Sequence, residues 1–479
     1  MTSDASAPQA GPAPQAGPAP EVVGVSADFP VEFAEPAHAG LTWEWDDMHM
    51  PFALAPLAAD WVRVTGQGFG SWKEHFGVDI PSRVLTAIWN GYAFFAYEPG
   101  AEGEARKAND ELALATFRAA EATTEAYWRE EALPTLKAIY RAMDEAPIER
   151  GAREDVASAW VDAWAGADLA WRIHFIAIRG PYQVLDDLAD LYESVVPGAS
   201  PGEALRLIQG VRHELYETEV GVERLAAIAA EQPTIAAALR AGTRSPDELA
   251  KLPGGEAFRA ALDAFLAEHG HLGQSVDNLM LASWGEDPEL LLGEIAKRLD
   301  HPAEGAEARR ARLAREADEL AAATRVRLTG QPEQAARFEA LLEVARRIGP
   351  ITETHNYWID RAAQAHIRRF ARRVGARLAR EGVLETADDV FYLTRQEVPD
   401  LLRHPEDRRA IVADRRALHE RQARRQPPRF LGKAPAAPSG EVDRFDGVRY
   451  ASTEDGVLRG TGASAGVVKG TARVVLTSA

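Results

Sequence analysis

The chain has 479 residues, of which 46% are hydrophobic and 27% charged, and its net charge at pH 7 is −19. This balance is typical of a soluble globular protein with a large core, and the length allows about three domains. So strong a negative charge excludes nucleic acid and anionic membranes as partner classes. No Cys is present, which excludes disulfides and thiolate metal sites and fits a reducing compartment.

The N-terminus is low in complexity, because the run from Ala7 to Pro12 is repeated from Ala13 to Pro18. Such a Pro/Gly/Ala tract buries too little apolar surface to offset its ordering entropy, so residues 1–25 are predicted to be a disordered tail. The tract is neither basic nor apolar enough for a signal peptide, and no run approaches the roughly 18 apolar residues that span a bilayer. We therefore expect a cytoplasmic protein.

Residues 29–56 are rich in Pro and Trp and lack periodicity, which indicates an extended strap. Asp46 and His49 lie in this strap, together with Asp47, Trp43 and Trp45. Two interpretations stay open. The polar residues form either an acid–base cluster over a pocket or a surface segment held in place by the tryptophans.

A helical pattern dominates from about Leu57 to Arg425, and we predict one large helical domain over residues 26–425. The positions Ile367, Phe370, Val374 and Leu378 follow one helix face, and arginines cover the opposite face, most simply as a solvated surface. Helix ends are predicted where Gly and Pro are adjacent. These breaks are Gly180-Pro181, Pro197-Gly198, Pro253-Gly254 and Gly349-Pro350.

One predicted helix carries three tryptophans and a histidine on a single face, at spacings of three and four. The three indoles either belong to the core or line a pocket for an aromatic ligand. A histidine beside such a pocket could take a proton from a bound hydroxyl group. These residues are Trp160, Trp164, Trp171 and His174.

A later helix carries His355 and Trp358, with Glu353, Asn356 and Asp360 predicted as a polar stripe on a different side. His366 shares the face of His355 but lies about 16 Å away along the axis, so the two cannot bind one metal ion. His269 and His271 flank a glycine and would diverge on a helix, so no metal site is predicted there.

Beyond the helices, a Pro-rich linker is predicted over residues 426–440, and the sequence then changes to strand spacing. Val467, Lys469, Thr471, Arg473 and Val475 alternate with smaller or apolar residues, which is typical of a β-strand. Residues 441–479 therefore begin a β-containing domain.

Several motifs, taken in order, resemble the phosphoenolpyruvate-utilising enzymes of the PEP-synthase-like phosphotransferase type, which include rifampin phosphotransferase and the large subunit of phenylphosphate synthase. The stretch 458–475 resembles the opening of their swivelling phosphohistidine domain, in which Gly460, Ser464, Gly466 and Gly470 fit the pattern Gly-x-x-x-Ser-x-Gly-x-x-x-Gly. Four other segments resemble their helical region. These are the strap at 43–56, His269-Gly270-His271 with the following 281–288, residues 353–360, and residues 388–393.

The resemblance implies a mainly α fold. A large helical acceptor-binding domain is expected to be followed by the first strands of a truncated swivelling domain, of which this chain contains only the start. The Gly-Gly-x-x-Ser-His-Ala segment that would carry the phosphorylated histidine is not in the sequence. No ATP-grasp domain is in it either, so a partner domain or subunit is expected to supply nucleotide binding. ATP and Mg are implied for that missing part, and no cofactor is expected on this chain.

The function that the resemblance implies is that of the acceptor-binding component of an ATP- or PEP-dependent phosphotransferase. It would phosphorylate a hydroxyl of a hydrophobic or aromatic small molecule and be inactive as this isolated chain. The candidate catalytic residues are His49, His174, His271, Glu353 and His355. The candidate substrate-binding residues are Trp45, Asp46, Trp164, Trp171 and Trp358. The alternative is a non-catalytic helical ligand-binding or scaffolding subunit.

Overall fold

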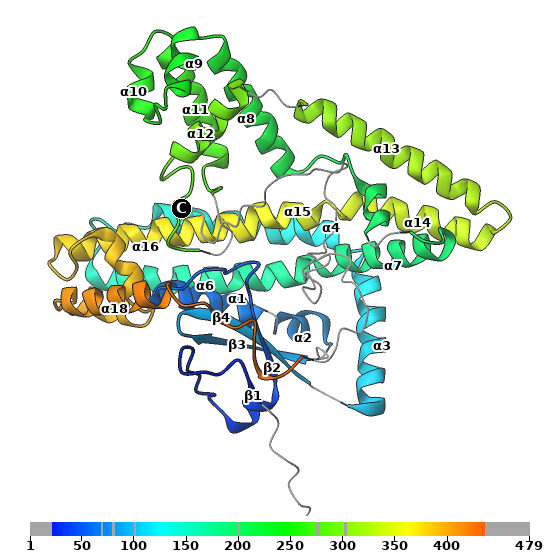
Figure 1. Ribbon diagram of the computed structural model, residues 1–479, viewed down its shortest axis with the longest axis horizontal. Helices are drawn as coiled ribbons and strands as arrows, with labels where there is room; N and C mark the ends of the chain where they lie inside the picture. Colours follow the sequence, from blue (N-terminus) through cyan, green and yellow to red (C-terminus); the bar gives the residue numbers. More distant parts are fainter. Residues whose placement is uncertain are drawn as a thin grey trace, which may run out of the picture.

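The computed structural model describes residues 22–68, 70–78, 82–99, 102–199, 202–273, 278–300 and 304–435. Most of these residues are helical, and one small antiparallel sheet packs below the main helices (Figure 1). The predicted mainly α fold is therefore confirmed. The predicted swivelling domain, 441–479, and residues 1–21 of the predicted tail lie outside the described residues.

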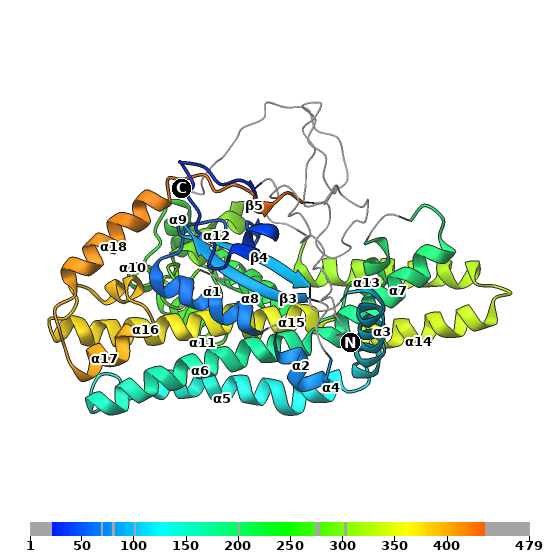
Figure 2. The same ribbon diagram turned by 90° about the horizontal axis from the view of Figure 1, so that it is seen from below.

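The main helices form a layer around one large hydrophobic core. Helices α6 and α16 run side by side through this layer and contact each other, as both views show (Figures 1 and 2). Their apolar faces meet at Trp160 and Phe370, whose ring centroids are 6.1 Å apart. The helices and helical turns of this layer are α1 (Pro56–Gly68), α2 (Ser71–Phe76), α3 (Gly103–Ala120), α4 (Thr124–Ala126), the π-helical η2 (Tyr127–Ala132), α5 (Leu133–Glu145), α6 (Arg153–Ala177), α7 (Arg179–Val195), the 3-10 turn η3 (Glu203–Ile208), α15 (Ile351–His355), the π-helical η4 (Asn356–Arg361), α16 (Ala362–Arg380), the 3-10 turn η5 (Ala387–Tyr392), α17 (Glu397–Arg403) and α18 (Arg409–Gln422).

A smaller lobe stands above this layer and has a core of its own, in which Phe258 and Leu262 are buried (Figure 1). The lobe is followed by a long helical hairpin. The lobe consists of α8 (Glu214–Ala230), α9 (Pro233–Arg240), α10 (Pro246–Ala250), α11 (Gly255–His269) and α12 (Glu289–Asp300), and the hairpin of α13 (Ala306–Arg327) and α14 (Pro332–Ile348).

The sheet has five strands in the order β1-β5-β2-β4-β3. It joins β1 (Val22–Val23) and β2 (Thr42–Trp45) to β5 (Phe430–Lys433), and the hairpin of β3 (Ser82–Trp89) and β4 (Tyr92–Pro99) completes it. The 3-10 turn η1 (Pro36–Gly40) precedes β2. The predicted tail and linker thus each contain a short strand, and the strap is part of the sheet.

The β3–β4 hairpin lies inside the range that was predicted to be helical, and that prediction is wrong there. Its turn is Asn90-Gly91, with φ values of 50° and 84°. Two successive positive φ angles give the turn that matches the twist of antiparallel strands, and Asn-Gly adopts them at the lowest cost. Phe94 and Ala96 of β4 face the core beneath the sheet, while Phe95 and Tyr97 point to the opposite face.

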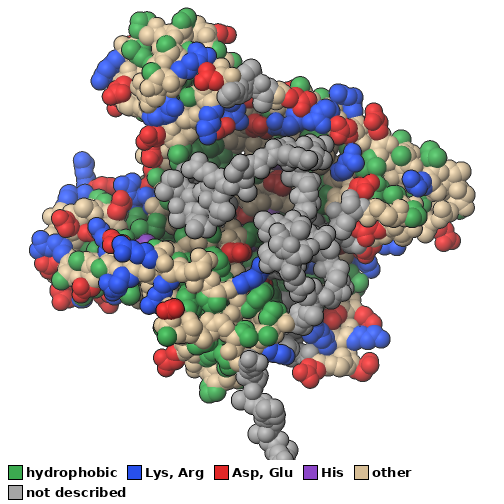
Figure 3. All heavy atoms as spheres, in the orientation of Figure 1, with side chains coloured by type: hydrophobic (Ala, Val, Ile, Leu, Met, Phe, Trp, Pro, Cys, Tyr) green, Lys and Arg blue, Asp and Glu red, His purple; other side chains and the backbone are tan. Residues whose placement is uncertain are grey.

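Two arginines of α16, a helix face that was predicted to be a solvated surface, bind the end of another helix. Arg373 and Arg377 donate to backbone carbonyls in the last turn of α5 and in the segment that follows it, and Arg377 is buried. The last carbonyls of a helix lack partners within the helix, so cationic donors stabilise them. Elsewhere, acidic and basic side chains are interspersed over the face that Figure 3 shows. Among the described residues, no helix has both the length and the apolar character that crossing a bilayer requires.

A first prediction concerns the close packing of α16 on η5. A Cβ at Gly375 would collide with the carbonyl oxygen of Ala387. We expect Gly375→Ala to lower the free energy of unfolding by about 2 kcal/mol, because backbone must move to admit the methyl group. Urea denaturation measures this change.

Gly293→Ala in α12 is the matched control. Its Cβ would meet only the flexible Arg244 side chain at 3.6 Å, so a gain of about 0.5 kcal/mol is expected. Equal effects at the two positions would contradict the packing argument.

A second prediction concerns Glu121, which lies beside the ion pair of Arg118 and Asp187. Burial, together with repulsion from Asp187, raises the pKa of Glu121 to about 7. A raised carboxyl pKa means that stability is fully present below pH 4.5 and is lost as the pH rises towards 7. We therefore expect Glu121→Gln to be more stable than the wild type at pH 8, by about 1 kcal/mol after allowance for solvent screening, and to lose this advantage at pH 4.

Urea unfolding at the two pH values measures the difference. The control is Glu130→Gln, which changes an exposed carboxylate of η2, and its effect on stability should be small at both pH values. An advantage of Glu121→Gln that is independent of pH would contradict the assignment.

Candidate functional site

A cavity of about 230 Å³ lies between the sheet and the main helices, and we call it the aromatic cavity. Five separate parts of the chain line it. The strap contributes residues 44–50, the hairpin contributes Val84, Phe95 and Tyr97, α1 contributes Thr65, α6 contributes Trp171, His174 and Phe175, and η4 contributes Asp360.

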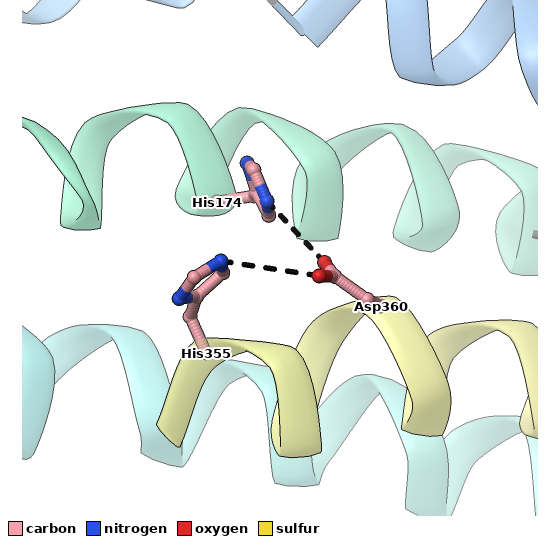
Figure 4. A group of neighbouring side chains, drawn as sticks. All are labelled: His174, His355 and Asp360. Carbon is pink, nitrogen blue, oxygen red and sulfur yellow. Dashed lines mark ion pairs between the residues drawn. The ribbon is translucent and has the colours of Figure 1, made fainter. Parts of the chain in front are cut away.

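Three polar side chains gather at the helical wall of the aromatic cavity, and Figure 4 shows them pointing toward one another. His174 comes from α6, His355 from the end of α15, and Asp360 from η4. The Nε2 atom of His174 lies 3.3 Å from Oδ1 of Asp360, and the Nε2 atom of His355 lies 3.9 Å from Oδ2. The two imidazole rings are in edge-to-face contact, with centroids 4.7 Å apart.

Asp360 reaches this cluster because the helix widens between Asn356 and Arg361. In a regular α-helix, a residue five positions after His355 points about 140° away from it, at 3.6 residues per turn. The segment is instead a single π-helical stretch, which adds residues to the turn and is frequent at functional sites. The hydroxyl of Tyr140 donates to the carbonyl of Trp358 within this stretch, at 2.5 Å. Sequence periodicity therefore placed Asp360 on the wrong side.

Both histidines of the cluster are held neutral. Burial lowers the pKa of His355 to about 4, although a hydrogen bond to the backbone opposes the shift. Burial, followed by electrostatic interaction with the neighbouring His355, lowers the pKa of His174 well below its ordinary value. The carbonyl of Ile351 lies 2.8 Å from Nδ1 of His355 and can only accept, so Nδ1 carries the proton and Nε2 presents its lone pair towards Asp360.

A second polar pair faces the aromatic cavity from the strap. His49 Nδ1 lies 3.0 Å from both carboxylate oxygens of Asp46, and the backbone N–H of His49 also donates to Asp46. The indole of Trp45 donates to the carbonyl of Met50 and closes the turn that holds the pair. The His49 side chain is 45% exposed, so the pair combines the two interpretations that the sequence left open.

Five predicted residues, Trp45, Asp46, His49, Trp171 and His174, therefore line one cavity, and His355 contacts it through His174 and Asp360. The tryptophans of the predicted helix face fall into both classes that the sequence left open, the core and the pocket. Trp171 lines the cavity, whereas Trp164 is buried in the main core and packs against Trp160.

Three predicted residues lie elsewhere. His271 is partly buried and its ring packs against Tyr357, and burial lowers its pKa to about 3. Trp358 donates its indole N–H to Glu214 and lies under Lys137. Glu353 is exposed and lines two other hollows together with His213. Glu353 and Trp358 are separated from the aromatic cavity because α15 and η4 turn their side chains to other faces, and His271 lies in the turn that follows α11.

Sequence reasoning missed several lining residues. Val84, Phe95 and Tyr97 come from the hairpin, for which Asn90-Gly91 was an available signal. Phe175 follows His174 directly and lies off the predicted tryptophan face. Asp360 had no signal, because a π-helical stretch leaves no mark in the apolar pattern.

Comparisons with known proteins identify relatives of this chain. Residues 182–353 match the family described as the fourth domain of rifampicin phosphotransferase. The chain is 26% identical to chondramide synthase of Chondromyces crocatus over an alignment of 474 residues, and the match covers 93% of this chain and 12% of that protein. It is 29% identical to rifampicin phosphotransferase of Streptomyces sviceus over 235 residues, which are 48% of this chain and 26% of that protein. It is 20% identical to an uncharacterized phosphotransferase of Bacillus subtilis over 347 residues, which are 70% of this chain and 41% of that protein.

The chain therefore spans only a part of each of these relatives, from about a tenth to two fifths of their length. The family match begins in α7 and ends in α15, so it covers the small lobe and the long hairpin. The motifs and the matches agree: the chain is similar to rifampicin phosphotransferases, which supports a phosphotransferase-like family of the phosphoenolpyruvate-utilising type.

Proposed function

We propose that this chain is the acceptor-binding component of a phosphotransferase, and that the aromatic cavity holds the molecule to be phosphorylated. The acceptor is a hydrophobic or aromatic small molecule with a hydroxyl group. The observation that carries the proposal is the position of the His174–His355–Asp360 cluster at the wall of a cavity that several aromatic side chains also line.

The walls of the cavity suit an apolar ring. Phe95, Trp171 and Phe175 supply flat hydrophobic surface, and Trp171 is held by an edge-to-face contact with Trp61 at 5.9 Å. Ligand sites of this kind combine apolar walls with a few polar groups that fix orientation. A volume of about 230 Å³ fits a single substituted ring better than a macrocycle.

The polar groups suit a hydroxyl group at one end of that ring. In the transfer step, the acceptor oxygen forms a bond to phosphorus while the bond between phosphorus and the carrier nitrogen breaks. The hydroxyl proton must leave the oxygen, and the cluster and His49 are among the cavity-lining groups that can accept it. This chain would accelerate phosphoryl transfer mostly by holding the acceptor hydroxyl next to these proton-accepting groups.

The phosphohistidine carrier and the ATP-grasp unit come from polypeptide other than the described residues, and ATP with Mg acts there. The proposal includes neither nucleic acid nor a membrane as a partner. We propose that the reaction takes place in the cytoplasm. A mobile carrier is physically reasonable, because nucleotide and apolar acceptor need separate sites from which water is excluded.

Calorimetric titration of the 479-residue chain with a panel of phenols, alicyclic alcohols and macrocycles tests the proposal. We expect single-ring phenols to bind with one site per chain. Val84→Trp fills the aromatic cavity from β3, where aromatic residues are favourable, and should weaken binding at least about 10-fold. Val84→Ala is the matched control and should retain binding.

Transfer is then measured as phosphorylation of the bound phenol when ATP and the polypeptide that carries the phosphohistidine are added. Phenol phosphorylation that is lost in Val84→Trp supports the proposal. Binding without transfer supports the alternative, a non-catalytic ligand-binding subunit. If no compound binds, or if Val84→Trp binds as the wild type does, the cavity is not the acceptor site.

A further inference from the structure

The cluster of His174, His355 and Asp360 also has the composition and spacing of a metal-binding site. Each residue offers one ligand atom, and these atoms all lie within 4.8 Å of one another. Two ligand atoms at about 2.1 Å from a tetrahedral zinc ion lie about 3.4 Å apart. His174 Nε2 and Asp360 Oδ1 already have this spacing, at 3.3 Å, and His355 Nε2 needs only a small side-chain rotation to reach it.

The surroundings of His355 support this assignment independently. Its Nδ1–H donates to the carbonyl of Ile351, which leaves the Nε2 lone pair directed at Asp360. Histidines that bind metal ions almost always donate their other N–H to a carbonyl or carboxylate, because this bond fixes the tautomer and the ring orientation. The Nε2 lone pair and the carboxylate oxygen are both electron-rich and repel each other, so a cation between them stabilises the arrangement.

His174 does not oppose this arrangement. Its Nδ1 atom is buried and has no hydrogen-bond partner among the described residues, so no contact at that nitrogen dictates which nitrogen carries the proton. The Nε2 atom is therefore able to present a lone pair to an ion shared with Asp360.

The position of the cluster leaves one side of such an ion accessible. His174 and Asp360 line the aromatic cavity, whereas His355 is only 3% exposed and lies behind them. Three protein ligands with an open fourth position are the arrangement of catalytic zinc sites. Imidazole ligands favour zinc-like ions over Mg²⁺ and Ca²⁺, which prefer oxygen atoms.

We infer that His174, His355 and Asp360 bind a divalent transition-metal ion of the zinc type, whose open coordination position faces the aromatic cavity. Its role rests on the proposed function, because the ion would bind the acceptor oxygen and favour loss of its proton. His49 lines the same cavity and lies outside this ligand set. The sequence predicted no metal, because Asp360 and His355 were assigned to different helix faces.

The test uses the 479-residue chain after removal of metal ions by a chelator. Calorimetry with ZnCl₂ is expected to show one ion per chain, and Co²⁺ is expected to give the visible absorption bands of a site with nitrogen and oxygen ligands. Zinc should raise the melting temperature, because it binds only the folded chain. His174→Gln, His355→Gln and Asp360→Asn keep the side-chain volume, and each should weaken zinc binding at least about 10-fold.

His366→Gln is the matched control. His366 lies on the adjoining helix α16, is largely buried and pairs with Asp144 at 3.1 Å, so its replacement should leave zinc affinity unchanged. The inference is overturned if the wild type takes up less than one ion. It is also overturned if the three cluster variants bind zinc as tightly as the wild type does.

Titration with a phenol in the absence of metal separates the two proposals. Phenol binding without any zinc uptake overturns the metal site and leaves the proposed function standing. Zinc uptake in a chain that binds no phenol keeps the metal site and contradicts the proposed function. Circular dichroism of each variant shows whether a loss reflects unfolding.

Discussion

Asp360→Asn is expected to reduce acceptor phosphorylation by about 100-fold or more, while phenol affinity changes little. The substitution keeps the shape of the side chain and removes its charge, so the walls of the aromatic cavity remain as they are. Loss of a group that receives or orients a transferred proton costs about 10²- to 10⁴-fold in rate. The measurement is steady-state phosphorylation of a phenol by the chain together with the polypeptides that supply ATP binding and the phosphohistidine.

Asp144→Asn provides the control for this prediction. Asp144 also pairs with a largely buried histidine, His366, but it does not line the aromatic cavity. Its replacement should leave the rate of phosphorylation unchanged. A wild-type rate in Asp360→Asn would show that the cluster takes no part in transfer, even if the cavity binds the acceptor.

The sequence predicted best those residues of the site whose contacts are with residues close to them in the chain. Trp171 and His174 share a helix face at a spacing of three, and regular α-helical geometry is enough to bring both to one cavity. Asp46 and His49 were also identified, because a pair three residues apart in a turn interacts locally. In both cases the contact depends on residues that are near in sequence.

The residues that could not be predicted depend on irregular or long-range structure. Asp360 reaches His355 only through the π-helical stretch, and Phe95 reaches Trp171 only because a hairpin packs on helices far away in sequence. The strand β5 likewise pairs with β2 across almost the whole chain. Side-chain periodicity reports which face of an element is apolar, and it does not report which distant element covers that face.

The arginine pattern of α16 gave a wrong result for a related reason. Arginines opposite an apolar helix face look like a solvated surface, yet the loop that precedes α12 covers Arg368. Its guanidinium group pairs with Glu286 at 3.0 Å, donates to the carbonyl of Leu279, and lies over the ring of Phe391. Arg368 and Glu286 are each only 6% exposed at the side chain.

Removing one partner of this ion pair is therefore expected to cause the largest loss of stability. Arg368→Met leaves the Glu286 carboxylate in a buried place with Arg372 as its remaining cation, and we expect a loss of about 3 kcal/mol. Arg372 is 38% exposed, so Arg372→Met on the same carboxylate should cost less than about 1 kcal/mol. Urea unfolding of both variants measures the difference between a buried and a half-exposed partner.

The double variant Arg368→Met with Glu286→Leu distinguishes the ion pair from simple packing. If the loss arises from an uncompensated buried charge, removing that charge as well should restore much of the stability, and the two changes should not add. If the loss arises from the contacts of the Arg368 stem with Phe391, the double variant should be at least as unstable as Arg368→Met alone. Glu286 lies in the loop between α11 and α12, through which the small lobe contacts α16. Recovery would therefore also show that this contact needs a matched pair of groups and not specifically a charged pair.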